Sequence, residues 1–186
     1  MAVLPDSVYR VCRKKRVQQI ESLQNMIIRA QALIKEAFRP FGDVLETEGV
    51  EPQLINFGNT QKFGELAQIT TRDNANAQLC IYRSKAIVLP FRIQLMECHP
   101  LGSQAFYPLH QNPFPVVVAK AGGKPGPADI QVFLTNGRQG VNLHAGVWHH
   151  YQLTLDQDSD YLVIDRRGND DNYLEHPLSE EVWLDI

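Results

Sequence analysis

Short runs of alternating apolar and polar residues fill most of this chain, but one segment near its start follows a longer period. Within residues 6–26, apolar side chains recur at the spacing of a helix face, with Lys15 and Arg16 interrupting the stripe. Asp6 or Ser7 can cap the first turn, so we predict a helix here. Because the segment is basic, it is either a targeting or partner-binding helix or a solvated extension, and solvated faces are the commoner case.

From residue 27 onward the alternation has a period of two and is broken by Gly, Pro and Asn, which predicts strands joined by turns. Many short strands without helical crossovers favour an antiparallel β-barrel or jelly roll. We therefore expect an all-β fold, with residues 1–26 as an N-terminal helical extension and residues 27–186 as one domain. The predicted strands cover 27–33, 42–47, 53–57, 66–71, 77–83, 92–97, 104–107, 114–119, 129–134, 140–142, 151–155 and 161–165.

Composition argues against several classes of protein. The net charge of −3 over 186 residues shows no basic excess, so nucleic acid is not an expected partner. No apolar run is long enough to span a membrane and no signal-peptide core is present, so we expect a cytoplasmic protein without a membrane partner. Cys12, Cys80 and Cys98 are widely spaced and match no disulfide or zinc pattern.

Two polar runs, 97–106 and 144–150, interrupt the apolar pattern. Glu97 and His99 alternate as side chains on one face of a strand would. Gln104 stands near the start of the next predicted strand, and His149 belongs to the second run. Polar side chains that converge from two hairpins would form a pocket in the mouth of a small barrel. Because buried polar groups need partners, we predict that these four residues share one site that binds a ligand or a metal.

Two further features qualify this site. His149 and His150 are neighbours on one predicted strand, so both cannot enter the pocket, and we expect His150 to point away from it. The polar segment 165–172 has the composition of a turn. We interpret it as a solvated loop with an Asp–Arg ion pair rather than as part of the site.

The two polar runs resemble the motifs of the cupin superfamily in altered form. Glu97-x-His99 stands where a cupin has His-x-His, and Gln104 stands for the usual Glu. The run from His144 to His149 matches the second motif, with His144 replacing a Pro. Two imidazoles and one carboxylate, from Glu97, His99 and His149, could still hold a divalent ion with open positions.

Residues 33–178 more closely resemble the ureidoglycolate lyase family. The matching stretches are 36–38 with 41–44, 99–106, 135–142, 146–150 and 164–166. The resemblance implies a carbon–nitrogen lyase of allantoin and purine catabolism, which splits (S)-ureidoglycolate into glyoxylate and urea and is usually a homodimer. The chain departs from the family pattern at Phe57, at Lys62–Gly64 and at Leu143, which are positions where substrate contacts could change.

The chemistry implied by this resemblance needs a base, an acid and a cation for the substrate carboxylate, but no cofactor. A histidine could be the base, Glu97 the acid, and Gln104 a donor to a developing oxyanion. Arg83 is the first candidate for the carboxylate and Lys62 the second, with Asn142 as a further substrate contact. An Arg83 that only pairs with a surface acid is an equally good interpretation of its position.

Several alternatives remain open at this point. A divalent ion held by Glu97, His99 and His149 could polarise the substrate hydroxyl in place of acid–base catalysis. The acid and the base are not assigned within the site. The chain could also be another cupin enzyme, a metal-dependent dioxygenase or isomerase, or a non-catalytic cupin that binds a small acid.

Overall fold

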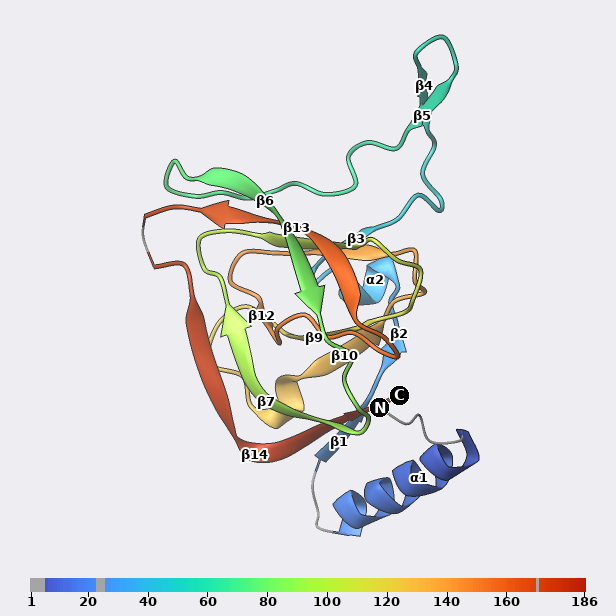
Figure 1. The fold of residues 1–186 in the computed structure, drawn as a ribbon. Helices are drawn as coiled ribbons and strands as arrows, with labels where there is room; N and C mark the ends of the chain where they lie inside the picture. The colour runs from blue at the N-terminus through green and yellow to red at the C-terminus, as the bar shows by residue number, and fades with distance from the viewer. Residues whose placement is uncertain (1–5, 23–25, 170) are drawn as a thin grey trace.

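The computed structural model describes residues 6–22, 26–169 and 171–186. Two β-sheets form the body of the protein, and one helix lies outside them (Figure 1). The seven-stranded sheet has the order β1 (Met26–Arg29), β14 (Leu174–Asp185), β7 (Phe91–Cys98), β12 (Trp148–His149), β9 (Pro115–Ala119), β10 (Gln131–Leu134) and β2 (Gln31–Ala32). The five-stranded sheet has the order β3 (Gly42–Leu45), β11 (Gly140–Leu143), β8 (Gln104–Pro108), β13 (Ser159–Arg167) and β6 (Asn76–Ser84).

Four short elements lie outside the two large sheets, and an all-β fold is confirmed. The helical turn α2 (Lys35–Phe38) and the 3-10 turn η1 (Pro127–Asp129) connect strands, while β4 (Gln53–Ile55) and β5 (Thr60–Lys62) form a separate hairpin. Figure 1 shows this hairpin projecting away from the barrel, on the side where β3, β6 and β13 lie.

The expectation of purely antiparallel pairing is wrong at two places. Strand β1 runs parallel to β14, and β2 runs parallel to β10. Both β1 and β2 are edge strands. Together they overlap the segment 27–33, which the sequence predicts as one strand, and β1 starts one residue before it. Segments 66–71 and 151–155 form no strand and contain only single bridges, at Thr71 and Thr154. Strand β14 escapes prediction because its polar first half is exposed and its register shifts between Pro177 and Val182.

Strand β9 separates two hydrophobic cores, and its five residues are all buried. Val116 and Val118 pack between the two sheets, together with an aromatic group in which Phe38 meets Phe133 at a ring-centre distance of 5.2 Å. Val117 packs on the opposite face of the seven-stranded sheet. That sheet curls around the second core, so that β1 reaches back to contact β10. The space between the sheets is the one into which the polar residues described below project.

Helix α1 (Asp6–Ser22) lies against the end of β14, as Figure 1 shows. Arg13 donates to the buried carboxylate of Asp185 over 3.1 Å and also to the backbone carbonyl of Ile186. The Arg16 guanidinium lies 5.5 Å from the ring centre of Trp183. The predicted helix is confirmed over this range and residues 23–25 lie outside the described structure, but Met26, the last residue of the predicted helix, begins β1 instead. The domain division at residue 26 stays a prediction. None of the helices in the described ranges is both long and apolar enough to cross a membrane.

Candidate active site

The site begins with a cross-strand pair in the seven-stranded sheet. Glu97 on β7 is directly opposite His149 on β12, and His149 is opposite Val118 on β9. Residues opposite each other in a sheet share a face. Because Val118 belongs to the core between the sheets, Glu97 and His149 also face that inter-sheet space. Their strand neighbours Cys98 and Trp148 belong to the other core.

His99 joins this pair from just beyond the end of β7. Its Nδ1 lies 2.7 Å from the backbone carbonyl oxygen of Asn172, which holds the ring in place. The rings of His99 and His149 have centres 5.2 Å apart. One ligand atom from each of Glu97, His99 and His149 lies within 4.8 Å of the others, and we call these three residues the trio.

The hydrogen bonds of the two imidazoles assign their tautomers. A carbonyl oxygen can only accept, so His99 donates from Nδ1 to Asn172, and His149 donates from Nδ1 to the carbonyl of His150 over 3.1 Å. In the neutral imidazoles, Nε2 therefore carries the lone pair. The buried Nε2 of His149 has no hydrogen-bond partner in the described parts of the chain.

Burial sets the protonation states of two trio members in opposite directions. Desolvation lowers the pKa of His149 to about 3, helped by the neighbouring His99, so this imidazole is neutral at physiological pH. Desolvation raises the pKa of Glu97, while His99 and the Tyr173 hydroxyl oppose that rise. The site thus combines a neutral imidazole with a carboxyl group that holds its proton more tightly than an exposed one.

Tyr173 covers the trio from the segment that leads into β14. Its ring centre is 5.9 Å from that of His99, and its hydroxyl donates to Glu175 over 2.8 Å and lies 3.4 Å from Glu97. The hydrogen bond to Glu175 raises the pKa of Tyr173, so the phenol remains a proton donor. The interpretation of segment 165–172 as a solvated loop is therefore wrong: Asn172 anchors His99, and β13 extends to Arg167. The sequence carries no local signal for these long-range contacts.

Gln104 approaches the same space from the opposite sheet. It begins β8, is 7% exposed and is directly opposite Leu143, which belongs to the core between the sheets. Its Oε1 lacks a hydrogen-bond partner among the residues that the structure describes. The loop 99–103 connects it to His99, so both lie at the same end of the barrel. No hydrogen bond or ring contact within the described residues joins Gln104 to the trio directly.

Arg83, Lys62 and Asn142 do not join this group. Arg83 is on the outer face of β6, where it makes a two-pronged pair with Asp160 at 2.8 and 2.9 Å. Lys62 ends the exposed strand β5. Asn142 is fully buried, but it faces the outer side of the five-stranded sheet and donates to Asp43 over 2.9 Å. For Arg83, the geometry favours the surface ion pair over a clamp for a carboxylate.

His150 points away from the trio, as strand alternation predicts. Its ring packs edge-on against Phe91, 5.6 Å away, and its Nδ1 donates to the carbonyl of Tyr151 over 3.1 Å. Burial lowers the pKa of His150 to about 4. Phe91 packs against the second core, so His150 is a packing residue of that core.

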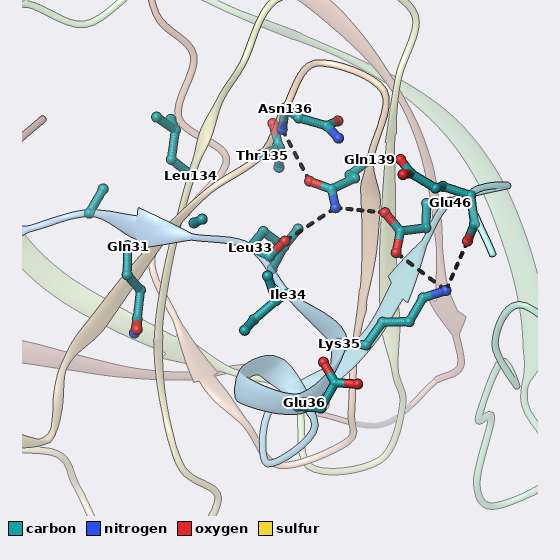
Figure 2. Close-up of a pocket in the computed structure, with 13 residues that line it drawn as sticks. Gln31, Leu33, Ile34, Lys35, Glu36, Glu46, Leu134, Thr135, Asn136 and Gln139 are labelled. Carbon is teal, nitrogen blue, oxygen red and sulfur yellow. Dashed lines mark hydrogen bonds and ion pairs between the residues drawn. The ribbon is translucent and has the colours of Figure 1, made fainter.

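A cavity of about 640 Å³ beside α2 lies apart from this chemistry (Figure 2). Part of its polar lining is paired: Gln139 donates to Glu46 over 2.7 Å and to the carbonyl of Leu33 over 3.2 Å. Lys35 lies 3.3 Å from the other oxygen of Glu46. These three groups satisfy one another, and none of the four residues predicted for the site lines the cavity.

The trio fits a divalent metal ion. Two imidazoles, each with Nδ1 donating to a backbone carbonyl, and one carboxylate form a common ligand set for such ions. The unpartnered Nε2 of His149 would gain a partner that the described structure does not supply. The same three groups can also exchange protons with a bound substrate.

Comparison with known proteins gives a consistent result. The sequence model for ureidoglycolate lyase matches residues 25–185. The chain is 49% identical to a ureidoglycolate lyase of Pseudomonas paraeruginosa over 158 residues, which are 84% of this chain and 94% of that protein. It is 47% identical over 155 residues to a ureidoglycolate lyase of Pseudomonas putida, covering 83% of this chain and 93% of the relative. The family match leaves helix α1 outside its range.

Proposed function

The chain belongs to the ureidoglycolate lyase family, and we propose that it cleaves ureidoglycolate to glyoxylate and urea at the trio. The observation that carries this proposal is the convergence of Glu97, His99 and His149, whose ligand atoms lie within 4.8 Å of one another. Their position, facing the space between the sheets, would keep bulk water from much of the substrate.

The reaction breaks one C–N bond and moves one proton at each end of it. A proton leaves the substrate hydroxyl as the C=O bond of glyoxylate forms, and the C–N electron pair passes to the nitrogen of urea, which takes up a proton. The lone pair on His99 Nε2 can accept the first proton, because Asn172 keeps the Nδ1 proton in place. Glu97, whose pKa burial raises, can carry the proton for the leaving nitrogen.

In an alternative arrangement, the three residues of the trio, Glu97, His99 and His149, would bind a divalent ion. Such an ion would supply a Lewis acid that polarises the substrate hydroxyl. In that arrangement the neutral His149 acts as a ligand. Its pKa of about 3 makes it a poor proton acceptor, so the role of a ligand suits it better. Nδ1 of each imidazole stays bonded to its carbonyl in both arrangements.

One experiment tests the function and separates the two arrangements. Purified protein is supplied with ureidoglycolate, glyoxylate and urea are measured together, and the metal content of the same sample is determined. Equal amounts of the two products support the lyase reaction. Direct release of ammonia would mean a hydrolase, oxygen consumption a dioxygenase, and binding without turnover a non-catalytic cupin. Activity that survives complete chelation supports acid–base catalysis without an ion.

We also propose that the protein forms a homodimer through the outer face of the five-stranded sheet. Leu79 and Ile81 on β6 are 67% and 53% exposed, and Ile81 aligns with Leu162 across the sheet. Strand β6 is also an edge strand, with one row of backbone groups available for pairing. Arg83 and Asp160 border this apolar face, so a second copy related by two-fold symmetry would meet complementary charges.

A further inference from the structure

Three inward-facing side chains of the five-stranded sheet form a second polar group opposite the trio. Phe106 on β8 and Val163 on β13 belong to the core between the sheets, so by alternation Gln104 and Asp165 share their inner face. Ile164 pairs with Ala105, which brings Asp165 alongside Gln104 one residue further along the two strands. Tyr82 on β6 points inward as well.

The hydrogen bonding of this group is incomplete. The Tyr82 hydroxyl donates to Asp165 Oδ2 over 3.2 Å, which holds the carboxylate in one orientation. Asp165 Oδ1 and Gln104 Oε1 are both buried and have no hydrogen-bond partner in residues 6–22, 26–169 and 171–186. Buried acceptors without donors are costly, so two such atoms side by side indicate a ligand that brings donors.

This group and the trio face the same space. Gln104 follows His99 after the short loop 99–103, which places both at one end of the barrel. Burial, together with the charge and the hydrogen bond of Asp165, raises the pKa of Tyr82 to about 12. The phenol of Tyr82 therefore remains a protonated donor at neutral pH.

We propose that Gln104 and Asp165, oriented by Tyr82, form the subsite that binds the ureido group of the substrate. This proposal rests on the proposed function. A ureido group presents three N–H donors around one carbonyl, which complements a carboxylate oxygen and an amide oxygen. The negative Asp165 also repels the carboxylate of the substrate, so it turns that end away and orients the C–N bond toward the trio.

Two non-reacting ligands test the subsite without requiring turnover. N-carbamoylglycine has a ureido group and a carboxylate but no hydroxyl, and N-acetylglycine replaces the terminal amine with a methyl group. Calorimetric titration of the wild-type chain should show N-carbamoylglycine binding about ten-fold or more tightly than N-acetylglycine, because charge-assisted hydrogen bonds would be lost.

The variant Asp165→Asn should lose most of this preference, whereas Asp160→Asn should keep it. Asp160 is on the same strand but faces solvent beside Arg83, so it is a matched control. Tyr82→Phe retains the carboxylate and should weaken the preference several-fold, which covers the case in which Asp165→Asn fails to fold. No preference in the wild type, or a preference that Asp165→Asn leaves intact, would overturn the subsite. Absence of glyoxylate and urea release would instead overturn the proposed reaction, since the titration requires none.

Discussion

Glu97 and His149 are directly opposite each other on β7 and β12, and this register is what assembles the site. Opposed residues in an antiparallel pair project from the same face, so one hydrogen-bonding register brings a carboxylate and an imidazole together. A slip of one residue would place Cys98 or Trp148 there instead. The site therefore depends on the same backbone pairing that closes the barrel.

Replacing either trio histidine should remove most of the activity. His99→Ala and His149→Ala should each lower kcat about 100-fold or more, because each imidazole has a role in proton transfer or ion binding that no neighbour can take over. Steady-state kinetics on folded protein measures this. His150→Ala is the control: its ring packs on Phe91, so it should affect stability and leave kcat within a few-fold. Equal kinetic losses at His150 would contradict the assigned faces.

Ion binding at the trio should be measurable without substrate. The metal-free wild type, titrated with Ni²⁺, Mn²⁺ or Zn²⁺ in a calorimeter, should bind about one ion per chain, and Glu97→Gln should weaken binding about ten-fold or more. His144→Ala is a suitable control, since His144 pairs with Asp43 on the outer side of the sheet, 3.3 Å away. If Glu97→Gln leaves the affinity for the ion unchanged, the ion binds at another place, and acid–base catalysis at the trio is favoured.

Strand alternation and motif spacing are sufficient to predict the trio, but not its surroundings. Glu97 and His99 alternate on one strand, and the second run supplies His149 by resemblance. The face of Arg83 could not be predicted, because β6 carries apolar side chains on both faces: Ile81 is exposed and Cys80 packs inward. Because the outer face of β6 also carries exposed leucine and isoleucine, the alternation of apolar and polar residues does not show which side chains of this strand face the core.

The contacts of segment 165–175 escaped prediction for a different reason. Asn172 meets His99, and Tyr173 lies beside Glu97, through pairings between residues more than seventy positions apart. Only the register of β14 against β7 brings them together, and β14 itself lacks a clear alternating pattern. The all-β barrel can be predicted from local patterns, whereas the contacts of Asn172 and Tyr173 with the trio depend on how distant strands pair.

The outer face of the five-stranded sheet should control association. Ile81→Lys places a charge in the middle of the exposed apolar face and should convert a dimer to a monomer at micromolar concentration. Sedimentation equilibrium provides the measurement. Val88→Lys introduces the same charge at another exposed apolar residue, 61% accessible and outside β6, and should leave the mass unchanged. A wild-type chain that sediments as a monomer would refute the dimer itself.

Acidification should destabilise the fold through His110. The backbone N–H of Asn112 donates to His110 Nδ1 over 3.1 Å, so the ring is neutral, and burial lowers its pKa from the usual 6.5 while Asp160 opposes the shift. The unfolded chain therefore binds this proton at a higher pH than the folded chain does. The contribution to stability is complete well above pH 6.5 and is lost progressively as the pH falls below that value.

His110→Asn keeps an acceptor for the Asn112 N–H but does not titrate in this range. Between pH 7.5 and 5.5, the free energy of unfolding should therefore fall less for the variant than for the wild type. Denaturation in urea at each pH gives both values. Parallel losses in the two proteins would show that His110 is not linked to folding.

Gly102 lies in the loop 99–103, which connects His99 of the trio to Gln104 of the proposed subsite, and it packs against β13. A β-carbon on this glycine would lie 2.5 Å from the Cβ of Arg166, an atom that cannot rotate away because it is attached to the backbone of β13. Gly102→Ala must therefore displace either β13 or the loop 99–103. That loop carries His99 at one end and leads to Gln104 at the other, so a displacement would misalign the trio and the proposed ureido subsite together.

We expect Gly102→Ala to destabilise the fold by about 1–3 kcal/mol, the usual cost of an overpacked contact. It should also lower kcat about ten-fold or more in the protein that remains folded, because small displacements of reacting groups are costly. Gly123→Ala is the matched control, since a β-carbon there meets nothing within 4 Å. Thermal unfolding and steady-state kinetics on both variants separate the two effects. A Gly102→Ala variant with a lower Tm but a normal kcat would show that β13 is displaced while the loop keeps its geometry. Gly102 would then have no role in positioning the site, which would depend on the strand pairing alone.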